Sequence, residues 1–471
     1  MTRLRQVGGA LLVSCYELGH QPLSLASPLA ALEAAGFRPR AIDTSVDPLD
    51  PLAVRDAHLV AIAVPMHTAL RLGQDVAREV RALNPGAHIS FYGLYAWLNA
   101  DYLFEAGLAD SVIGGEYEQP LVRLAEALDS DLPLLPRRVP GLRLAGEAAP
   151  EPGGAIRTMD GHMPARAQLP DLGRYAHLLR DGHEAAAGYV EATRGCKHTC
   201  RHCPITPVYG GRFVAVPREV VLADIRAQAD AGAKHITFGD PDFLNGPTHS
   251  LRILRQMHAE FPALTFDATI KVEHILRHAA LLPELRELGC VFVVSAVESL
   301  SDRVLEHLAK GHTAEDVDRA FDVMAGAGIP LRPTFVAFTP WTALDDYLHL
   351  LHYVHNRGLV DAVDPVQYAI RLLIPPRSAL LEDAAGTPWL GELDREAFSY
   401  RWTHPDPRMD VLHAEVAAIV ECGALDCADP FDTFEAVLSA ACRIARVEVP
   451  PLARPSSEGH PPPRLTESWF C

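Results

Sequence analysis

Residues 189–204 have the sequence YVEATRGCKHTCRHCP, in which a short strand pattern leads into three closely spaced cysteines. Cys196, Cys200 and Cys203 follow the pattern Cys-x3-Cys-x2-Cys. Three thiolates hold three irons of a four-iron cluster and leave the fourth iron open, whereas a fourth cysteine would close the cluster. The spacing therefore predicts a [4Fe-4S] cluster with one open coordination position.

An open iron can chelate the amino and carboxylate groups of S-adenosylmethionine. One electron from the cluster then breaks the sulfonium C–S bond, which releases methionine and a 5'-deoxyadenosyl radical, while the protein positions the cofactor. A structural zinc site is the alternative, since His198 or His202 could supply a fourth ligand. No second Cys/His pair follows at zinc-finger distance, so the pattern favours the cluster.

Strand and helix patterns alternate after the cysteine loop. The predicted strands are residues 235–238, 265–268, 291–296 and 332–337, and the predicted helices are residues 217–231, 250–260, 279–288 and 314–327. Repeated βα units of this kind predict a partial (β/α) barrel with its active groups at the C-terminal ends of the strands. Those ends hold Gly239, Asp240, Lys271, Glu298 and Ser299.

The first 130 residues alternate in the same way and predict a doubly wound α/β domain with a parallel sheet. The predicted strands are residues 9–15, 38–43, 59–64, 88–92 and 110–113. Ligands of such sheets lie beyond the C-terminal strand ends. The candidates there are Tyr16, His20, Thr68, Gly93, Gly115 and Glu116. A purely structural domain is the alternative, because a fold alone does not fix a function.

The remaining segments complete a division into residues 1–130, a linker at 131–184, the barrel at 185–385 and a mostly helical C-terminal region at 386–471. The linker is rich in proline, glycine and charge without a sustained period. Residues 410–421 and 433–445 show helical periodicity. Cys422, Cys427 and Cys442 lie in this region, and we expect free cysteines there and no second cluster.

These features together resemble radical S-adenosylmethionine enzymes that carry a cobalamin-binding domain before the barrel. His202 matches the ring residue before the last cysteine of that family's loop. Gly239 and Asp240 take the place of the Gly-Gly-Glu segment that holds the methionine amino group, and Glu298 and Ser299 match a Glu-Ser pair of the cobalamin-dependent branch.

The same resemblance implies that the loop residues Tyr16, His20, Thr68, Gly93, Gly115 and Glu116 bind cobalamin. The Asp-x-His-x-x-Gly motif that places a histidine under cobalt in other cobalamin proteins is absent. His20 and His67 lie in suitable loops without that spacing. We therefore expect cobalamin to bind without a histidine below the cobalt.

Arg371 is a charge within the apolar stretch 367–375, which we expect to be a strand. A charge in such a place needs a partner. One interpretation gives it a substrate or cofactor carboxylate, and the other a salt bridge to Glu298 or Asp240. Asp240, Glu298 and Arg371 are the candidate catalytic residues.

Composition limits the functions that this chain can have. The formal net charge is −18, which disfavours binding to nucleic acid. The apolar runs are too short for a membrane span, and the N-terminus lacks a full signal peptide, so we expect a cytoplasmic protein.

The sequence analysis leads to an enzyme that cleaves S-adenosylmethionine to modify a small molecule, with cobalamin-dependent methyl transfer as the chemistry that the resemblance implies. It would take electrons from an external reductant such as flavodoxin or ferredoxin. One alternative is a cobalamin-independent radical rearrangement or carbon–heteroatom bond formation. Another is an iron–sulfur sensor.

The two ends of the chain carry a narrower resemblance. The opening residues 14–22 (SCYELGHQP) and the ending PPPRLTESWFC resemble a radical S-adenosylmethionine family named for a Cys-Cys-Ala-Glu-Pro or Cys-selenocysteine-Ala-Glu-Pro tail. Here the sequence stops after the first cysteine of that tail, Cys471. We expect a UGA codon for selenocysteine to follow, with a genuine terminus as the alternative.

Overall fold

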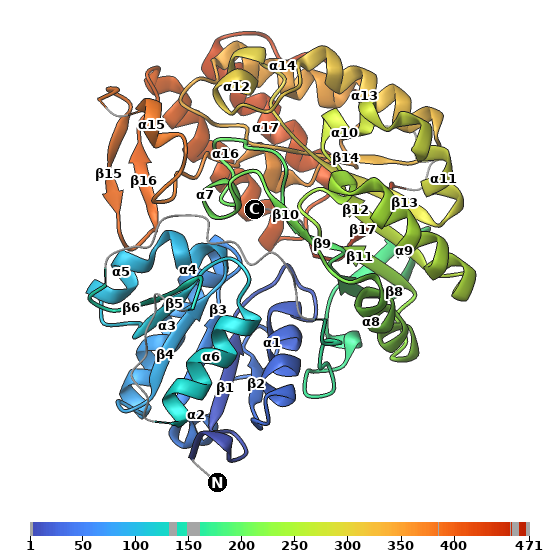
Figure 1. Ribbon diagram of the computed structural model, residues 1–471. Coiled ribbons are helices and arrows are strands. Elements are labelled where there is room, and N and C mark those ends of the chain that lie inside the picture. Colours follow the sequence, from blue (N-terminus) through green and yellow to red (C-terminus); the bar gives the residue numbers. More distant parts are fainter. Residues whose placement is uncertain are drawn as a thin grey trace.

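The computed structural model describes residues 3–130, 139–147, 161–384, 386–452, 454 and 461–467. An N-terminal α/β domain lies against a partial barrel, and a C-terminal region of helices and a hairpin adjoins both of them (Figure 1). None of the described helices is both long and apolar enough to cross a membrane.

The N-terminal sheet has the strand order β2-β1-β3-β4-β5-β6, in which all strands but β6 are parallel. Its strands are β1 (Ala10–Ser14), β2 (Arg40–Asp43), β3 (Leu59–Ala63), β4 (His88–Tyr92), β5 (Ser111–Ile113) and β6 (Leu142–Leu144). The order reverses between β1 and β3, and ligands of doubly wound sheets bind beyond the strand ends at such a point.

Two layers of helices cover this sheet because its buried strands are apolar on both faces. Leu11 and Ile62 face one core, and Leu12 and Ala61 face the other. The flanking helices are α1 (Leu23–Ala34), α2 (Pro51–Asp56), α3 (His67–Leu83), α4 (Leu94–Leu98), α5 (Ala100–Glu105) and α6 (Glu118–Asp129).

The barrel sheet has the order β14-β13-β12-β11-β8-β7-β17. Its parallel strands are β8 (His183–Val190), β11 (His235–Phe238), β12 (Thr265–Thr269), β13 (Cys290–Glu298) and β14 (Leu331–Phe335). The antiparallel strands β7 (His177–Arg180) and β17 (Arg464–Leu465) extend one edge. A short hairpin of β9 (Thr193–Gly195) and β10 (Phe213–Ala215) flanks the cysteine loop, which continues into α7 (Thr206–Tyr209).

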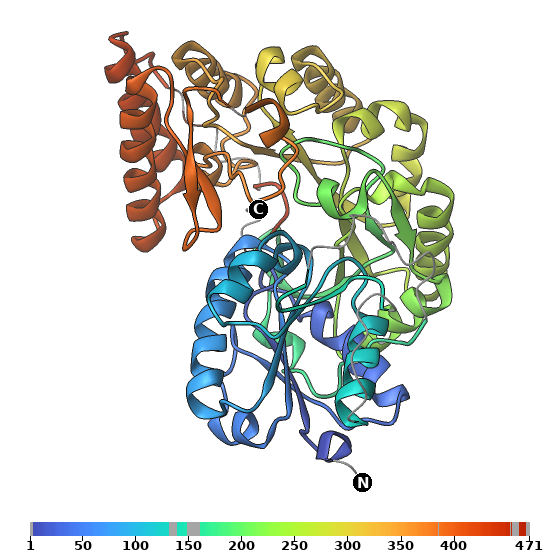
Figure 2. The ribbon, with the colours of Figure 1, turned by 60° about the vertical axis from the view of Figure 1, so that its left-hand side comes forward.

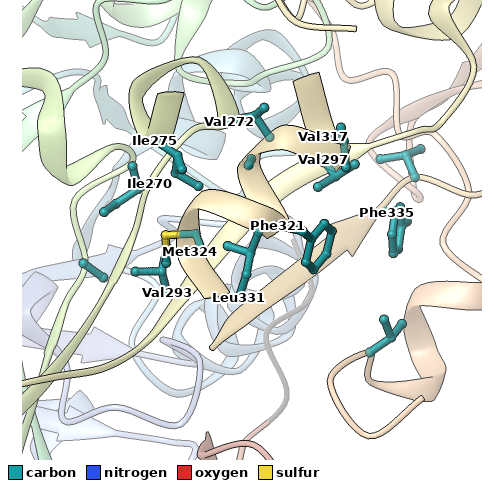
Figure 3. Packing of buried hydrophobic residues seen from close by; sticks show 14 of the residues in the cluster. Ile270, Val272, Ile275, Val293, Val297, Val317, Phe321, Met324, Leu331 and Phe335 are labelled. Carbon is teal, nitrogen blue, oxygen red and sulfur yellow. The ribbon is translucent and has the colours of Figure 1, made fainter. Parts of the chain in front are cut away.

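Helices cover the outer face of the barrel (Figure 2). They are α8 (Arg218–Asp230), α9 (Pro247–Glu260), α10 (Val272–Arg277), α11 (Leu282–Glu287), α12 (Asp302–His307), α13 (Ala314–Gly326) and α14 (Leu344–Asn356). Val317, Phe321 and Met324 lie on one side of α13, as a 3.6-residue period requires. They pack against Val293 of β13 and Leu331 of β14 (Figure 3).

The C-terminal region contains α15 (Leu381–Ala384), a hairpin of β15 (Leu390–Asp394) and β16 (Ser399–Trp402), α16 (Pro407–Leu425) and α17 (Pro430–Ala445). The two long helices were predicted and the hairpin was not. The predicted linker also contributes strands, because β6 pairs with β5 and β7 pairs with β8. These strands have three or four residues, which is too short for a recognisable period.

Candidate functional site

A cavity of about 330 Å³ lies between the two domains, at the C-terminal ends of their strands. The barrel contributes all three cysteines of the loop, together with His202, Gly239, Asp240 and Glu298. The N-terminal domain contributes residues from the loops that follow β1 and β3 and from the start of α4. The residues predicted to bind a cluster and S-adenosylmethionine therefore meet the domain predicted to bind cobalamin.

The cysteine loop depends on a glycine at its start. Gly195 has φ +77°, and a Cβ at this position would lie 2.5 Å from the Tyr209 ring. The side-chain oxygen of Asn245 accepts a hydrogen bond from the Lys197 amide at 3.2 Å and lies 3.9 Å from Sγ of Cys196. The loop thus begins in a fixed conformation, tied to the segment after β11.

The cysteines form a donor set that fits an iron–sulfur cluster. Cys196, Cys200 and Cys203 are free of disulfide bonds and line one cavity. Burial raises the pKa of the Cys203 thiol to about 12, so the thiolate needs a compensating positive charge. Iron supplies that charge, because a coordinating thiol is deprotonated.

Asp240 anchors the strand that leads into the cysteine loop. Its carboxylate accepts hydrogen bonds from the Ala192 amide at 2.9 Å and from the Thr193 hydroxyl at 2.5 Å. The side chain is almost fully buried, and burial raises its pKa to about 7. Asp240 lines the cavity. Both of its hydrogen bonds, however, hold parts of the protein in place: the backbone of Ala192 and the side chain of Thr193.

Glu298 ends β13 in a strained conformation and carries a buried negative charge. Its φ is +68°, and the register with β14 shifts beside it. The carboxylate lies 3.1 Å from Nζ of Lys310 and 3.1 Å from Nε2 of His202. Burial alone would raise the pKa of Glu298, yet Lys310 and His202 hold it well below the usual range. Strain of this kind clusters at functional sites.

Arg194 connects the cysteine loop to the N-terminal domain. Its buried guanidinium donates to Glu116 at 3.0 Å, to Glu118 at 2.7 Å and to Glu191 at 2.6 Å. The Tyr209 hydroxyl also donates to Glu116 at 2.8 Å. Glu116 was predicted to bind cobalamin, and the structure instead places its carboxylate in this link between the domains.

The N-terminal wall of the cavity is apolar and aromatic. It is formed by Leu18, Pro65, Met66, Leu94 and Tyr95, with His20 beside them. The His20 ring stacks on Tyr189 of β8 with centroids 4.7 Å apart, and burial lowers its pKa to about 4. A wall of this chemistry fits a large, flat ligand such as a corrin ring.

Several predicted residues lie away from this cavity. Tyr16, Thr68, Gly93, Gly115, Glu116 and Ser299 are not among the described residues that line it. Tyr16 instead donates a hydrogen bond to Glu467 at 2.5 Å. Ser299 caps the turn that follows β13, where its hydroxyl accepts from the Ser301 amide at 3.1 Å.

The predicted salt bridge of Arg371 to Glu298 or Asp240 is wrong. The guanidinium lies over the Trp402 ring, 3.6 Å from its centroid, and pairs with Asp410 at 2.9 Å. The segment forms a single parallel bridge with Phe338 where we expected a strand. The partner, Asp410, belongs to α16. A charged side chain within an apolar stretch needs such a partner. These contacts give no support to a catalytic role.

The sequence analysis missed several polar residues of the cavity. Lys310 and Arg332 bring positive charge to it beside Lys271, which the sequence analysis did place at a strand end. Thr237 and Asp267 line its interior. Thr237 and Asp267 alternate with apolar residues on β11 and β12, and this period of two indicates an inward-facing polar row. The alternation along a strand shows which side chains face inward, but it does not show which residues from other elements pair with each charge.

The family model for the Radical SAM superfamily matches residues 190–349, from the end of β8 into α14. Most of the barrel therefore matches a radical SAM domain. The match contains the whole cysteine loop and the strand ends that surround it.

Curated relatives match this chain at low identity. The chain is 24% identical over 281 residues to an uncharacterized methyltransferase of Pyrococcus horikoshii, covering 58% of this chain and 57% of the relative. It is 23% identical over 282 residues to the anaerobic magnesium-protoporphyrin IX monomethyl ester cyclase of Rubrivivax gelatinosus, covering 57% and 47%. The chain thus spans about half the length of the curated relatives that it matches.

Solved structures resemble the chain beyond the radical SAM domain. The radical S-adenosylmethionine methyltransferase TsrM of Kitasatospora setae, solved with cobalamin and a [4Fe-4S] cluster, covers 98% of this chain and 93% of its own, with a TM-score of 0.65 and 18% identity. The cobalamin-dependent radical enzyme OxsB covers 88% and 66%, with a TM-score of 0.66 and 16% identity. The predicted fold, a Rossmann-like domain before a partial barrel, is confirmed.

Proposed function

We propose that this protein is a cobalamin-dependent radical S-adenosylmethionine enzyme that modifies a small molecule, with methyl transfer as its chemistry. The observation that carries the proposal is the shared cavity, in which Cys196, Cys200 and Cys203 face the loops of the N-terminal domain. A cofactor bound on the N-terminal wall would lie against the space that S-adenosylmethionine occupies.

The cysteines would hold the cluster, and a reduced cluster supplies the electron that cleaves S-adenosylmethionine. Glu298 keeps a negative charge at the cavity wall and can accept hydrogen bonds from ribose hydroxyls. Lys310 and His202 fix the position of its carboxylate. The apolar wall around Met66 and Tyr95 excludes water from the side that faces the N-terminal domain.

Cobalamin, when bound, would supply a carrier for the methyl group. In TsrM and OxsB the same fold is found with cobalamin. The wall that Leu18, Pro65, Met66, Leu94 and Tyr95 form supports the proposal for this chain. An external one-electron reductant of the flavodoxin or ferredoxin class would reduce the cluster.

The narrower tail family is also part of this proposal. Its supporting observation is that the opening motif and the end of the chain meet in space. Glu467 accepts a hydrogen bond from Tyr16, and its Cβ lies 2.8 Å from the position that a Cβ on Gly19 would take. Leu18, Arg464 and Glu467 all line the cavity. Cys471 lies outside the described residues.

Anaerobic turnover tests the proposed function. The reduced protein with its cluster is incubated with S-adenosylmethionine, and 5'-deoxyadenosine and methionine are measured by mass spectrometry. We expect slow formation of both without the native substrate. An intact, reduced cluster that forms no 5'-deoxyadenosine would support the sensor alternative. Cleavage by a protein that retains no cobalamin would support the cobalamin-independent alternative.

A further inference from the structure

Two buried side chains and one half-buried side chain outside the cysteine set converge beside the cavity. His198 comes from the cysteine loop, Asp242 follows β11, and His274 lies in α10. One potential ligand atom of each residue lies within 4.8 Å of those of the other two. The side chains of Asp242 and His274 are only 2% and 1% exposed. Polar atoms at this depth normally have partners.

The two histidine nitrogens approach the Asp242 carboxylate at ion-pair distance, without the alignment of a well-formed hydrogen bond. Nδ1 of His274 is 2.6 Å from Oδ2 of Asp242, and Nε2 of His198 is 3.4 Å from the same oxygen. None of the three has a hydrogen-bond partner of acceptable geometry among the described residues. In a hydrogen bond the N–H group points at the oxygen. Around a metal ion, the lone pairs point instead at a shared centre.

We propose that His198, Asp242 and His274 bind a divalent first-row transition-metal ion, separate from the iron–sulfur cluster. Two histidines and one carboxylate are the donor set of non-haem Fe(II) sites, and Zn(II) takes the same donors. His198 and Asp242 both line the cavity. An ion held by them lies at the cavity wall, where water or a substrate oxygen can complete its coordination.

Glu273 positions the first of these ligands. Metal binding through Nε2 of His198 requires the proton of the neutral ring on Nδ1. Nδ1 lies 3.6 Å from Oε2 of Glu273 and 3.1 Å from Nζ of Lys271. The Lys271 ammonium can only donate, so without a metal ion Nδ1 accepts from it and the ring proton lies on Nε2. A metal ion at Nε2 moves that proton to Nδ1, which requires Lys271 to turn from Nδ1 toward Glu273, 3.4 Å away, and leaves Glu273 as the acceptor for Nδ1. Metal-bound histidines commonly donate to a carboxylate in this way.

The chain offers a conservative variant and a matched control. Oδ1 of Asp242 accepts a hydrogen bond from the Leu244 amide at 3.2 Å, and this bond fixes the turn after β11. Asp242→Asn keeps an acceptor for that amide while removing the negative charge. The His278 ring lies edge-on to His274 with centroids 5.5 Å apart and does not belong to the ligand set. His278→Ala is therefore the control for His274→Ala.

Zinc binding to the full chain with its reconstituted cluster tests the proposal. The protein is equilibrated anaerobically with Zn(II), and bound zinc, iron and acid-labile sulfide are counted in the same sample. We expect about one zinc per chain in the wild type and in His278→Ala, as a single site requires. Asp242→Asn and His274→Ala should bind almost none while keeping their iron and sulfide.

A fourth variant distinguishes a metal site from a metal-free His–Asp–His cluster. Glu273→Gln should weaken zinc binding about 10- to 100-fold, the usual effect of losing a carboxylate behind a metal-bound histidine. A wild type that binds no zinc overturns the proposal, as does equal zinc in Asp242→Asn, His274→Ala and His278→Ala. Loss of the cluster together with zinc in both ligand variants also overturns it, because the residues would then serve the cysteine loop alone. The result does not depend on cleavage of S-adenosylmethionine, so the proposed function is tested separately.

Discussion

At the scale of single residues, each cysteine of the loop should be indispensable, because each thiolate holds a different iron. We expect alanine at position 196, 200 or 203 to abolish binding of the reconstituted cluster. Iron counting and the visible charge-transfer absorption measure this loss. Cys422, an exposed cysteine of α16, provides the control, and Cys422→Ala should keep wild-type iron. Near-wild-type iron in any loop variant would contradict the assignment.

The Glu298–Lys310 pair should behave as a buried ion pair. Removal of one partner leaves the other charge uncompensated, at a cost of about 3–5 kcal/mol. We therefore expect Lys310→Met to lower the free energy of unfolding by that amount. The double variant Glu298→Gln/Lys310→Met should recover much of the loss. Urea unfolding of all variants measures the coupling, and strictly additive losses would show that the two side chains do not interact.

The role of a residue can be predicted from the sequence when the pattern that reveals it lies among neighbouring residues. The three cysteines were found because their spacing alone specifies the cluster. Glu298 was found at a strand end, but its pairing with Lys310 was not predicted, because their contact arises only when the segment after β13 folds back. Arg371 was paired with the wrong carboxylate for the same reason, since Asp410 comes from a helix nearly forty residues further along the chain.

At the scale of elements, long periodic segments were predicted well and short edge segments were missed. The strands β11 to β14 are apolar and separated by amphipathic helices, which is a strong signal. By contrast, β17 has two residues, and its pairing with β7 joins positions far apart in the sequence. The hairpin of β15 and β16 carries charges on its exposed positions and was not expected.

The packing of β17 makes a testable prediction. Leu465 packs against the buried cluster of Leu178, Phe292 and Val294, and the Thr466 amide donates to the His177 carbonyl at 2.8 Å. Leu465→Asp would bury a charge there, so we expect β17 to detach from the sheet.

Hydrogen exchange by mass spectrometry should then show faster exchange in residues 177–180 and unchanged protection in β11 to β13. The matched control is Leu425→Asp, because Leu425 is 78% exposed on α16. The control should leave the exchange of β7 unaltered. Wild-type exchange of β7 in Leu465→Asp would mean that β17 does not hold this edge.

At the scale of the whole molecule, both domains direct their C-terminal strand ends into one cavity, as their separate folds require. The sequence predicted each set of strand ends but could not predict that the sets face each other. That arrangement depends on contacts between domains, such as those of Arg194 with Glu116 and Glu118. Two residues that were predicted to bind cobalamin instead hold distant parts of the chain together. Tyr16 contacts Glu467, and Glu116 contacts Arg194.

The last prediction concerns cobalamin on the N-terminal wall. We expect hydroxocobalamin to bind without a histidine below the cobalt. His67 Nε2 contacts the Ala397 carbonyl at 2.7 Å, and the buried His20 ring is held by stacking on Tyr189. The electron paramagnetic resonance spectrum of bound cob(II)alamin should therefore lack splitting from a histidine nitrogen, and His20→Ala and His67→Ala should leave it unchanged.

Equilibrium dialysis with matched substitutions locates the binding site. Leu94 lines the cavity, whereas Leu72 of α3 is 44% exposed. Aspartate at position 94 would place a charge against the apolar face of the ligand, so Leu94→Asp should weaken binding about tenfold or more. Leu72→Asp should bind as the wild type does. If the wild type binds no cobalamin well above micromolar concentration, or if both variants bind equally, the N-terminal wall holds another ligand and the methyl transfer must take a different carrier.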